Sequence, residues 1–352
     1  ATAMRMALKA IGVESELQVY VPRNLGTWRD AIFMEELDFL LRVKSKRKWV
    51  YLEAFNNFDA FGTPYPFLES AEGYAIAYDE ANRYYRATIP ASTVAENLNR
   101  QEYAIRLNEA MDLVRVERTS TFAGAEKRDL IGKANLDRDY LSADFEKYYV
   151  EPKSKGKKKD ETPVATGPKY ENPDRDDKVK ERKELFQKDV EREFDLDKYE
   201  DFELLQSGRF GDTALLQYRE KFTLKKLVSK AGRNYIFEVG KLIGDQIKLE
   251  GEELAGRKTD IWVPYARSIE NNIVVQVPAG YTVDGLQDLN LTVDNASGTF
   301  ISTARAEEDK LIITTKKVYK NNYDKKEAWV NYIAFLEPAY KFSQAKVVLK
   351  KK

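Results

Sequence analysis

Three carboxylates close together in the sequence, Glu35, Glu36 and Asp38, are of a type that could hold a hard metal cation. Calcium sites take about six to eight oxygen ligands, often from a loop with a glycine at its sharp turn. The segment around these side chains has no such glycine, and it leads directly into a predicted strand. We therefore predict no metal site here.

The chain of 352 residues contains no histidine and no cysteine. Their absence removes the commonest general base, the thiolate nucleophile and the usual zinc ligands. Cysteine protease and zinc hydrolase chemistry are thereby excluded for this chain. A serine triad is excluded too, because it needs an imidazole between the hydroxyl and the carboxylate. Carboxylate, lysine, tyrosine or serine–lysine chemistry remains available.

Residues 240–244 contain a Gly-Lys pair, which raises the question of a phosphate-binding loop. Leu242 follows the lysine where such a loop needs serine or threonine, and the required earlier glycine is missing. We interpret the segment as a turn between strands and predict no cofactor.

The aromatic residues give weaker evidence of a binding site. The four tryptophans are spread along the chain, which favours anchoring of cores over a carbohydrate platform. A group of tyrosines could either line a groove or pack in a core, and the sequence leaves both possibilities open: Tyr74, Tyr78, Tyr84 and Tyr85.

Length and composition predict a globular protein of two or three domains, since 43% of the residues are apolar and 12% are aromatic. Basic and acidic residues are equal at 58 each, so no net field favours nucleic acid or anionic lipid. No stretch approaches the roughly 18 consecutive apolar residues of a spanning helix. We predict no nucleic-acid partner and no membrane span, and any electrostatic function must be local.

Apolar residues at helical spacing from Met4 to Ile11, followed by Gly12, predict a helix with one buried face over residues 2–11. Because Ala1 already stands within this pattern, we expect a cleaved or truncated form of a longer protein. Residues 123–149 and 185–199 are also predicted helical. Many short β-type runs between turn signals indicate a β-sandwich. Strands are predicted at 17–21, 39–43, 49–52, 74–78, 84–89, 103–107, 114–122, 222–224, 235–239, 261–263, 273–277, 289–293, 310–315 and 328–335.

Residues 151–183 form the clearest boundary. Residues 153–159 are almost all basic, and prolines and glycines break any regular element after them. A nucleic-acid-binding arm would also be basic, but acidic residues follow directly and few aromatic residues are interleaved. We interpret the segment as a charged, flexible insertion.

Three parts of the sequence resemble one known arrangement. The helix that ends in Gly12 is similar to the catalytic helix of the transglutaminase-like superfamily, and Trp49–Glu53 is similar to the strand that carries its third catalytic residue. The most specific part is a block of four segments, at 230–235, 240–244, 260–267 and 277–281. Together they resemble exported bacterial transglutaminase-like (papain-like) proteins with flanking β-sandwich domains of unknown function, the DUF3857/DUF3858 type.

The resemblance implies where the catalytic residues would stand. Alignment on Gly12 places the nucleophilic cysteine upstream of Ala1, and alignment on Glu53 as the acid places Asp38 at the histidine position. A carboxylate at that position would disfavour the thiolate, because like charge raises the pKa of a thiol. Asp38 and Glu53 are thus degenerate positions, and we predict no catalytic residue in the chain.

The predicted fold class is α+β and mostly β, a truncated transglutaminase-like segment followed by β-sandwich structure. Residues 1–70 would be the C-terminal part of the transglutaminase-like domain, and residues 71–150 a β-rich segment with a helix. The charged insertion at 151–183 would precede a C-terminal β-sandwich at 184–352.

The sequence leaves two functions possible, one a binding module and the other an enzyme. The first is a non-catalytic structural or interaction module that binds another protein or an envelope polymer. The second is a cysteine hydrolase or acyltransferase whose nucleophile lies upstream of this chain. The resemblance alone implies the periplasm or cell envelope of a Gram-negative bacterium.

Overall fold

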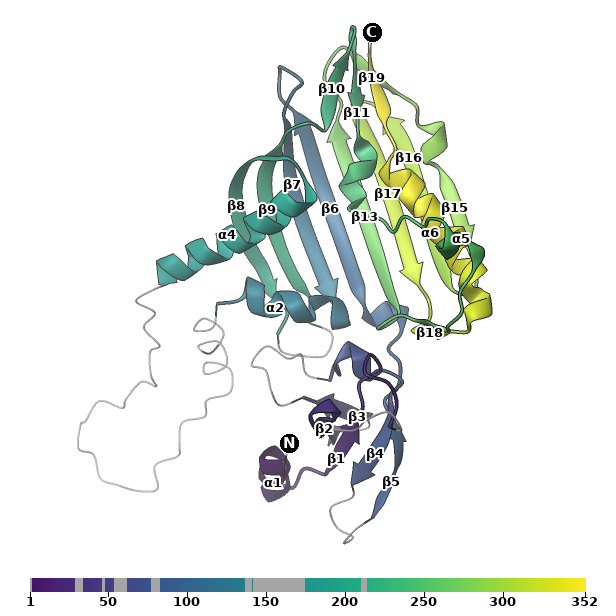
Figure 1. The fold of residues 1–352 in the computed structure, drawn as a ribbon. Coiled ribbons are helices and arrows are strands. Elements are labelled where there is room, and N and C mark those ends of the chain that lie inside the picture. The colour runs from purple at the N-terminus through teal and green to yellow at the C-terminus, as the bar shows by residue number, and fades with distance from the viewer. Residues whose placement is uncertain are drawn as a thin grey trace, which may run out of the picture.

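The computed structural model describes residues 2–28, 34–45, 48–53, 62–76, 83–136, 141, 175–209 and 214–352. Predictions on other residues, among them Tyr78, part of the helix predicted at 123–149 and most of the insertion at 151–183, lie outside the described residues. A small sheet is formed by the first part of the chain, and a much larger sheet is formed by strands from the rest of it (Figure 1).

The N-terminal helix α1 (Thr2–Ala10) forms as predicted, and Gly12 follows it with φ of 77°. The Gly12 N–H donates to the carbonyl of Lys9, so the glycine occupies the left-handed position that ends many helices. The predicted buried face is wrong. Arg5 is the buried residue of this helix, whereas the Met4 and Ile11 side chains are exposed.

The first sheet has five antiparallel strands in the order β3-β2-β1-β4-β5. Tyr20 and Leu40 belong to a core on one face, and Leu41 and Val43 belong to a core on the other, where Leu8 of α1 packs. The strands predicted in this part are confirmed, with shifted ends. They are β1 (Ser15–Tyr20), β2 (Asp38–Ser45), β3 (Lys48–Leu52), β4 (Glu72–Ile76) and β5 (Tyr84–Thr88).

The second sheet has eight strands in the order β15-β16-β17-β13-β6-β7-β9-β8. Its central pair, β13 and β6, is parallel, and every other neighbouring pair in it is antiparallel. The strands are β6 (Leu98–Leu107), β7 (Val114–Ala123), β8 (Leu196–Ser207), β9 (Leu216–Leu224), β13 (Arg267–Gln276), β15 (Leu291–Asp294), β16 (Gly298–Glu307) and β17 (Lys310–Tyr319).

The eight-stranded sheet joins strands from two segments that the sequence predicts as separate units. Strands β6 and β7 come from the segment predicted at 71–150, and the other six come from the segment predicted at 184–352. Strands β4 and β5, also from 71–150, belong instead to the first sheet. Sequence distance hid this pairing, because the parallel contact of β6 with β13 joins residues about 170 positions apart.

Helix α4 (Arg175–Glu193) corrects the predicted limits of the insertion and of the following helix. It begins inside the segment interpreted as flexible, and it ends before Tyr199, which lies in β8. Only two apolar residues of this charged helix are fully buried, Phe186 and Val190. Its apolar face is therefore narrow, and the polar composition of the segment did not indicate a helix.

Helix α6 (Trp329–Ser343) replaces the strand predicted at 328–335. The aromatic and β-branched residues at 328–335 have the composition of a strand, and a short apolar run is compatible with either a buried strand or a buried helix. Its buried residues Trp329, Tyr332, Leu336 and Ala339 recur at intervals of three and four, which is the helical period.

Shorter elements complete the fold. A four-stranded sheet has the order β10-β11-β19-β14, and a two-stranded sheet pairs β12 with β18. Helix α2 follows β7, and α5 precedes β12. Their bounds are β10 (Val228–Ala231), β11 (Asn234–Phe237), β12 (Ile261–Trp262), β14 (Tyr281–Asp284), β18 (Tyr323–Asp324), β19 (Val347–Lys351), α2 (Arg128–Ala134) and α5 (Glu252–Ala255).

One face of the eight-stranded sheet packs against α4 and α6, which both lie in front of it in Figure 1. Helix α6 comes very near the sheet at Gly298 of β16, where an added Cβ would stand 2.2 Å from Cε1 of Phe335. Along β6 the side chains alternate between buried and exposed, so the opposite face of the sheet is polar.

The structure is mostly β with several sheets, which confirms that part of the predicted fold class. Its β-rich character also fits the predicted β-sandwich. Within the described residues, none of the helices has the length and apolar content needed to cross a membrane.

Candidate functional site

The structure brings the two degenerate positions, Asp38 and Glu53, to the same arginine. Arg128 of α2 donates from Nη2 to Oε2 of Glu53 at 2.7 Å, and the backbone N–H of Tyr65 donates to the other carboxylate oxygen. The Glu53 side chain is 10% exposed. Burial raises the pKa of Asp38 above its usual range, although the charge of Arg128 acts in the opposite direction.

Contacts among Glu53, Arg128 and Tyr65, here called the clamp, join the small sheet to α2. The Arg128 guanidinium lies over the ring of Tyr65, with its Cζ atom 5.1 Å from the ring centroid. The Arg128 guanidinium is therefore held by a carboxylate and an aromatic face. The Glu53 carboxylate, which an acid–base mechanism would use, is engaged in this contact.

Further contacts join the same two parts of the chain. The rings of Phe67 and Trp262 lie 5.1 Å apart, and the Arg23 guanidinium stacks 5.2 Å from the Trp262 ring. Asn322 donates from its amide to Oγ of Ser70 at 2.9 Å. The two parts thus share an interface of ionic, aromatic and hydrogen-bonded contacts.

An apolar groove of about 420 Å³ lies on the small sheet beside its edge strand. The Trp28 and Tyr74 rings are 5.3 Å apart, and the Tyr74 and Tyr84 rings are 5.7 Å apart. Two of the tyrosines considered in the sequence therefore line a groove. Tyr85 lies on the opposite face of β5, where its hydroxyl donates to Glu16. The groove is lined by Val19, Trp28, Tyr74, Ile76, Arg83 and Tyr84.

Exposed apolar side chains concentrate in this part of the molecule. Contiguous exposed apolar surface marks interaction sites, and two of these exposed side chains, Ile76 and Tyr84, line the groove together. Within the described residues, the first quarter of the chain contributes more than half of the large exposed hydrophobic side chains. They are Met4, Met6, Ile11, Leu25, Met34, Ile76, Tyr84 and Tyr85.

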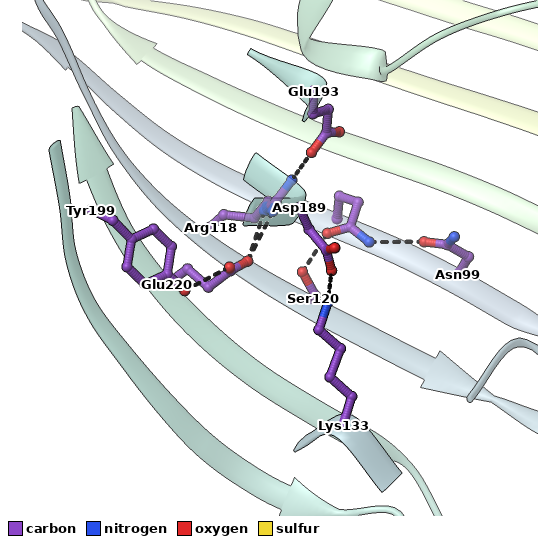
Figure 2. A network of polar contacts seen from close by, with 9 residues as sticks. Asn99, Arg118, Ser120, Lys133, Asp189, Glu193, Tyr199 and Glu220 are labelled. Atoms are coloured by element: carbon purple, nitrogen blue, oxygen red, sulfur yellow. Dashed lines mark hydrogen bonds and ion pairs between the residues drawn. The ribbon is translucent and has the colours of Figure 1, made fainter. Parts of the chain in front are cut away.

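A second candidate site is the ionic network between the eight-stranded sheet and α4 (Figure 2). Arg118 of β7 donates to Glu220 of β9 at 3.0 Å and to Glu193 of α4 at 2.6 Å. The hydroxyl of Tyr199 donates to the other oxygen of Glu220 at 2.8 Å. Nearby, Lys133 of α2 pairs with Asp189 of α4, so charged contacts fasten this helix at two points.

Electrostatics in this network favour the charged form of Arg118 and the neutral form of Tyr199. Burial lowers the pKa of Arg118, but the carboxylates of Glu220 and Glu193 raise it by more, so it stands well above its usual value. Burial and the charge of Glu220 raise the pKa of Tyr199, which therefore stays protonated and donates to the carboxylate. The network is internally satisfied and is best explained as structural.

The sequence gives one sign of this network, which is a charged residue at an inward-facing position of an otherwise apolar strand face. Val114, Val116 and Phe122 point inward from β7, and Arg118 stands at the same parity between them. A charged residue at an inward position needs a buried partner. The partner, Glu220, lies 102 positions away and could not be identified from the sequence.

A polar cavity of about 610 Å³ lies where the C-terminal ends of α4 and α6 converge. Its lining residue Lys226 pairs with Asp195 at 2.9 Å, and Lys241 pairs with Glu238 at 2.5 Å. Much of the charge around this cavity is therefore already compensated by the chain.

The predicted absence of a metal site concerned Glu35, Glu36 and Asp38. Across the part of the chain that the structure describes, no three histidine, cysteine, aspartate or glutamate side chains are placed to hold an ion.

Comparison with known proteins identifies one region. Residues 234–349, about a third of the chain, match the family DUF3858, described as a domain of unknown function with a solved structure. The match covers three of the four segments of the block that carried the resemblance, and it agrees with the DUF3857/DUF3858 type. Neither the curated proteins nor the solved structures contain a match to the chain.

Proposed function

We propose that the chain is a non-catalytic structural and protein-interaction module of an exported transglutaminase-like protein, acting in the periplasm or cell envelope. Its ligand would be an extended segment of another protein, bound at the groove beside β5. The observation that carries this proposal is the position of an apolar groove next to an exposed edge strand.

Strand addition explains how such a segment would bind. An edge strand presents unpaired backbone N–H and C=O groups, which an extended peptide can pair with. Strand β5 is at the edge of its sheet, and Tyr84, Tyr85 and Arg86 are exposed. Backbone pairing would supply affinity, and the groove would supply specificity for one large apolar side chain.

Charge restricts the partner further. Arg83 lines the groove, and Arg86 stands directly opposite Tyr74 on the same face of the sheet. Positive charge beside an apolar groove favours a segment in which acidic residues flank the apolar anchor.

The position of Glu53 supports the non-catalytic part of the proposal. Its carboxylate is held by Arg128 and by the backbone N–H of Tyr65, so it is engaged in a structural contact. A base or nucleophile would need a group free to exchange protons with a substrate.

The experiment is selection of peptides from a random displayed library on the purified chain, followed by affinity measurement. We expect selected peptides to share an apolar residue with acidic neighbours, and Tyr84→Ser to weaken binding at least about tenfold. Val330→Ser is the matched control, because Val330 is a similarly exposed apolar residue on α6.

N-methylation along the best peptide then tests the binding mode. Loss of affinity at every second position supports strand addition, because alternate N–H groups face the receiving strand. Peptides that bind Tyr84→Ser and the parent chain equally would contradict the proposal.

A further inference from the structure

The solvent face of the eight-stranded sheet, opposite α4 and α6, carries many charges that neutralise one another. Arg100 and Lys316 both pair with Glu270, at 2.8 Å and 3.1 Å. Arg219 pairs with Glu203 at 2.6 Å and with Glu117 at 3.5 Å. Exposed cross-strand pairs of this kind are the ordinary way in which a polar sheet face is stabilised.

Arg106 and Arg115 depart from this arrangement. They stand directly opposite each other on β6 and β7, both exposed, and neither has an ion-pair partner among the described residues. Like charges in directly opposed positions destabilise a sheet. A local conflict of this kind is expected where a residue serves binding instead of stability.

The same row of the sheet carries two more cations. Gln276 of β13 lies opposite Arg106 and also opposite Lys310 of β17, which is exposed. On the other side, Thr223 of β9 lies opposite Arg115 and also opposite Lys198 of β8. The cationic row therefore consists of Lys310, Arg106, Arg115 and Lys198, in this order across six strands.

We propose that this cationic row binds a linear, phosphate-bearing polymer that lies across the strands. Neighbouring strands are about 4.8 Å apart, so the four cations extend over roughly 24 Å, with the two arginines about 5 Å apart at the centre. Guanidinium groups match the geometry of phosphate oxygens with paired N–H donors, so the central arginines hold one phosphate and the lysines hold its neighbours along the polymer.

Two carboxylates lie beside the outer parts of the row, because Asp309 accepts a hydrogen bond from Gln276 and Glu200 accepts one from Thr223. The uncompensated charge is therefore that of the central pair, Arg106 and Arg115. The row contains no aromatic side chain on which bases could stack, which favours a polymer other than single-stranded nucleic acid.

The test uses inorganic polyphosphate of defined length and measures its affinity for the full chain at low salt. We expect Arg106→Gln combined with Arg115→Gln to weaken binding at least about tenfold. The slope of log K against log salt should become shallower by about 0.7 to 0.9 for each lost phosphate contact. The double lysine variant at the same positions keeps both charges but loses the paired N–H donors, so it should bind more weakly than the parent chain and more tightly than the double glutamine variant.

Arg100→Gln combined with Arg219→Gln is the matched control, because it removes the same charge from the same face but from residues that are ion-paired. We expect it to change affinity less than about twofold. Equal losses in the two pairs of variants, or no binding of polyphosphate by the parent chain, would overturn the proposal. Single-stranded DNA of equal charge should bind more weakly, and equal binding would overturn the choice of polymer.

Discussion

Arg128 Nη2 lies 2.7 Å from Oε2 of Glu53, and this contact joins the small sheet to α2 across 75 positions of the chain. Glu53 is the residue that the resemblance placed at the catalytic acid. Its carboxylate instead holds an arginine that stacks on Tyr65. We interpret Glu53 as a residue that holds the small sheet against α2.

Replacement of this carboxylate should therefore reduce stability. We expect Glu53→Gln to lower the free energy of unfolding by about 3 kcal/mol, because Arg128 would remain largely buried without the Glu53 carboxylate. Denaturant unfolding followed by fluorescence and circular dichroism measures the change. Lys178→Gln, which breaks an exposed pair with Glu181, should change it by less than about 0.5 kcal/mol. Equal effects of the two variants would contradict the clamp.

The network around Arg118 should behave as one unit. We expect Glu220→Gln and Arg118→Met each to destabilise the chain by about 3 kcal/mol, since Glu220 is fully buried and each change leaves a buried group without its partner. The double variant should lose less than the sum, with a coupling energy above about 1 kcal/mol. Additive losses in this double-mutant cycle would show that the two residues act separately.

Lys317 should make stability depend on alkaline pH. Burial, and to a smaller extent the charge of Arg267, lowers the pKa of Lys317 to about 8. Its pKa in the unfolded chain is higher, so between pH 8 and about 10.4 the unfolded state binds more protons, and stability rises with pH. The stabilising contribution is complete above that range and is lost as the pH falls through 8.

The measurement compares Lys317→Met with the parent chain by denaturant unfolding from pH 7 to pH 10. At pH 7 we expect the variant to be more stable by about 2 kcal/mol, because a charged, 8% exposed ammonium is removed. The difference should shrink towards pH 10. A difference that does not change with pH would contradict the assigned pKa.

Contact between β16 and α6 should be sensitive to a single methyl group. We expect Gly298→Ala to destabilise the chain by about 2 kcal/mol, because the new Cβ would overlap the Phe335 ring. Phe335→Leu, combined with Gly298→Ala, should recover part of the loss by opening space. If Gly298→Ala had no effect in thermal unfolding, α6 would have to pack on the sheet in another way.

Much of the sheet structure could be predicted from the sequence, and the reason is local. Alternation of apolar and polar residues is a property of each strand alone, as in β7, where Val114 and Val116 mark the buried face. The helix α6 was missed because Trp329 to Phe335 satisfies the composition of a strand. The helix α4 was cut short because its charged sequence resembles a flexible segment.

The candidate sites were harder to predict because they depend on strand order. Strand order places Arg106 between Gln276 and Arg115, and no short-range pattern specifies the parallel neighbour β13. The groove needed the pairing of β1, β4 and β5 as well as the position of Trp28. The tyrosines were recognised as a group, but the sequence left groove and core undecided.

Amide hydrogen exchange of the chain with and without a selected peptide tests the central claim most directly. If the groove binds an extended segment by strand addition, exchange should slow at alternate amides of residues 84–88, with less change in the eight-stranded sheet. Protection that is absent from β5, or that appears at other elements while β5 is unchanged, would contradict the proposed function.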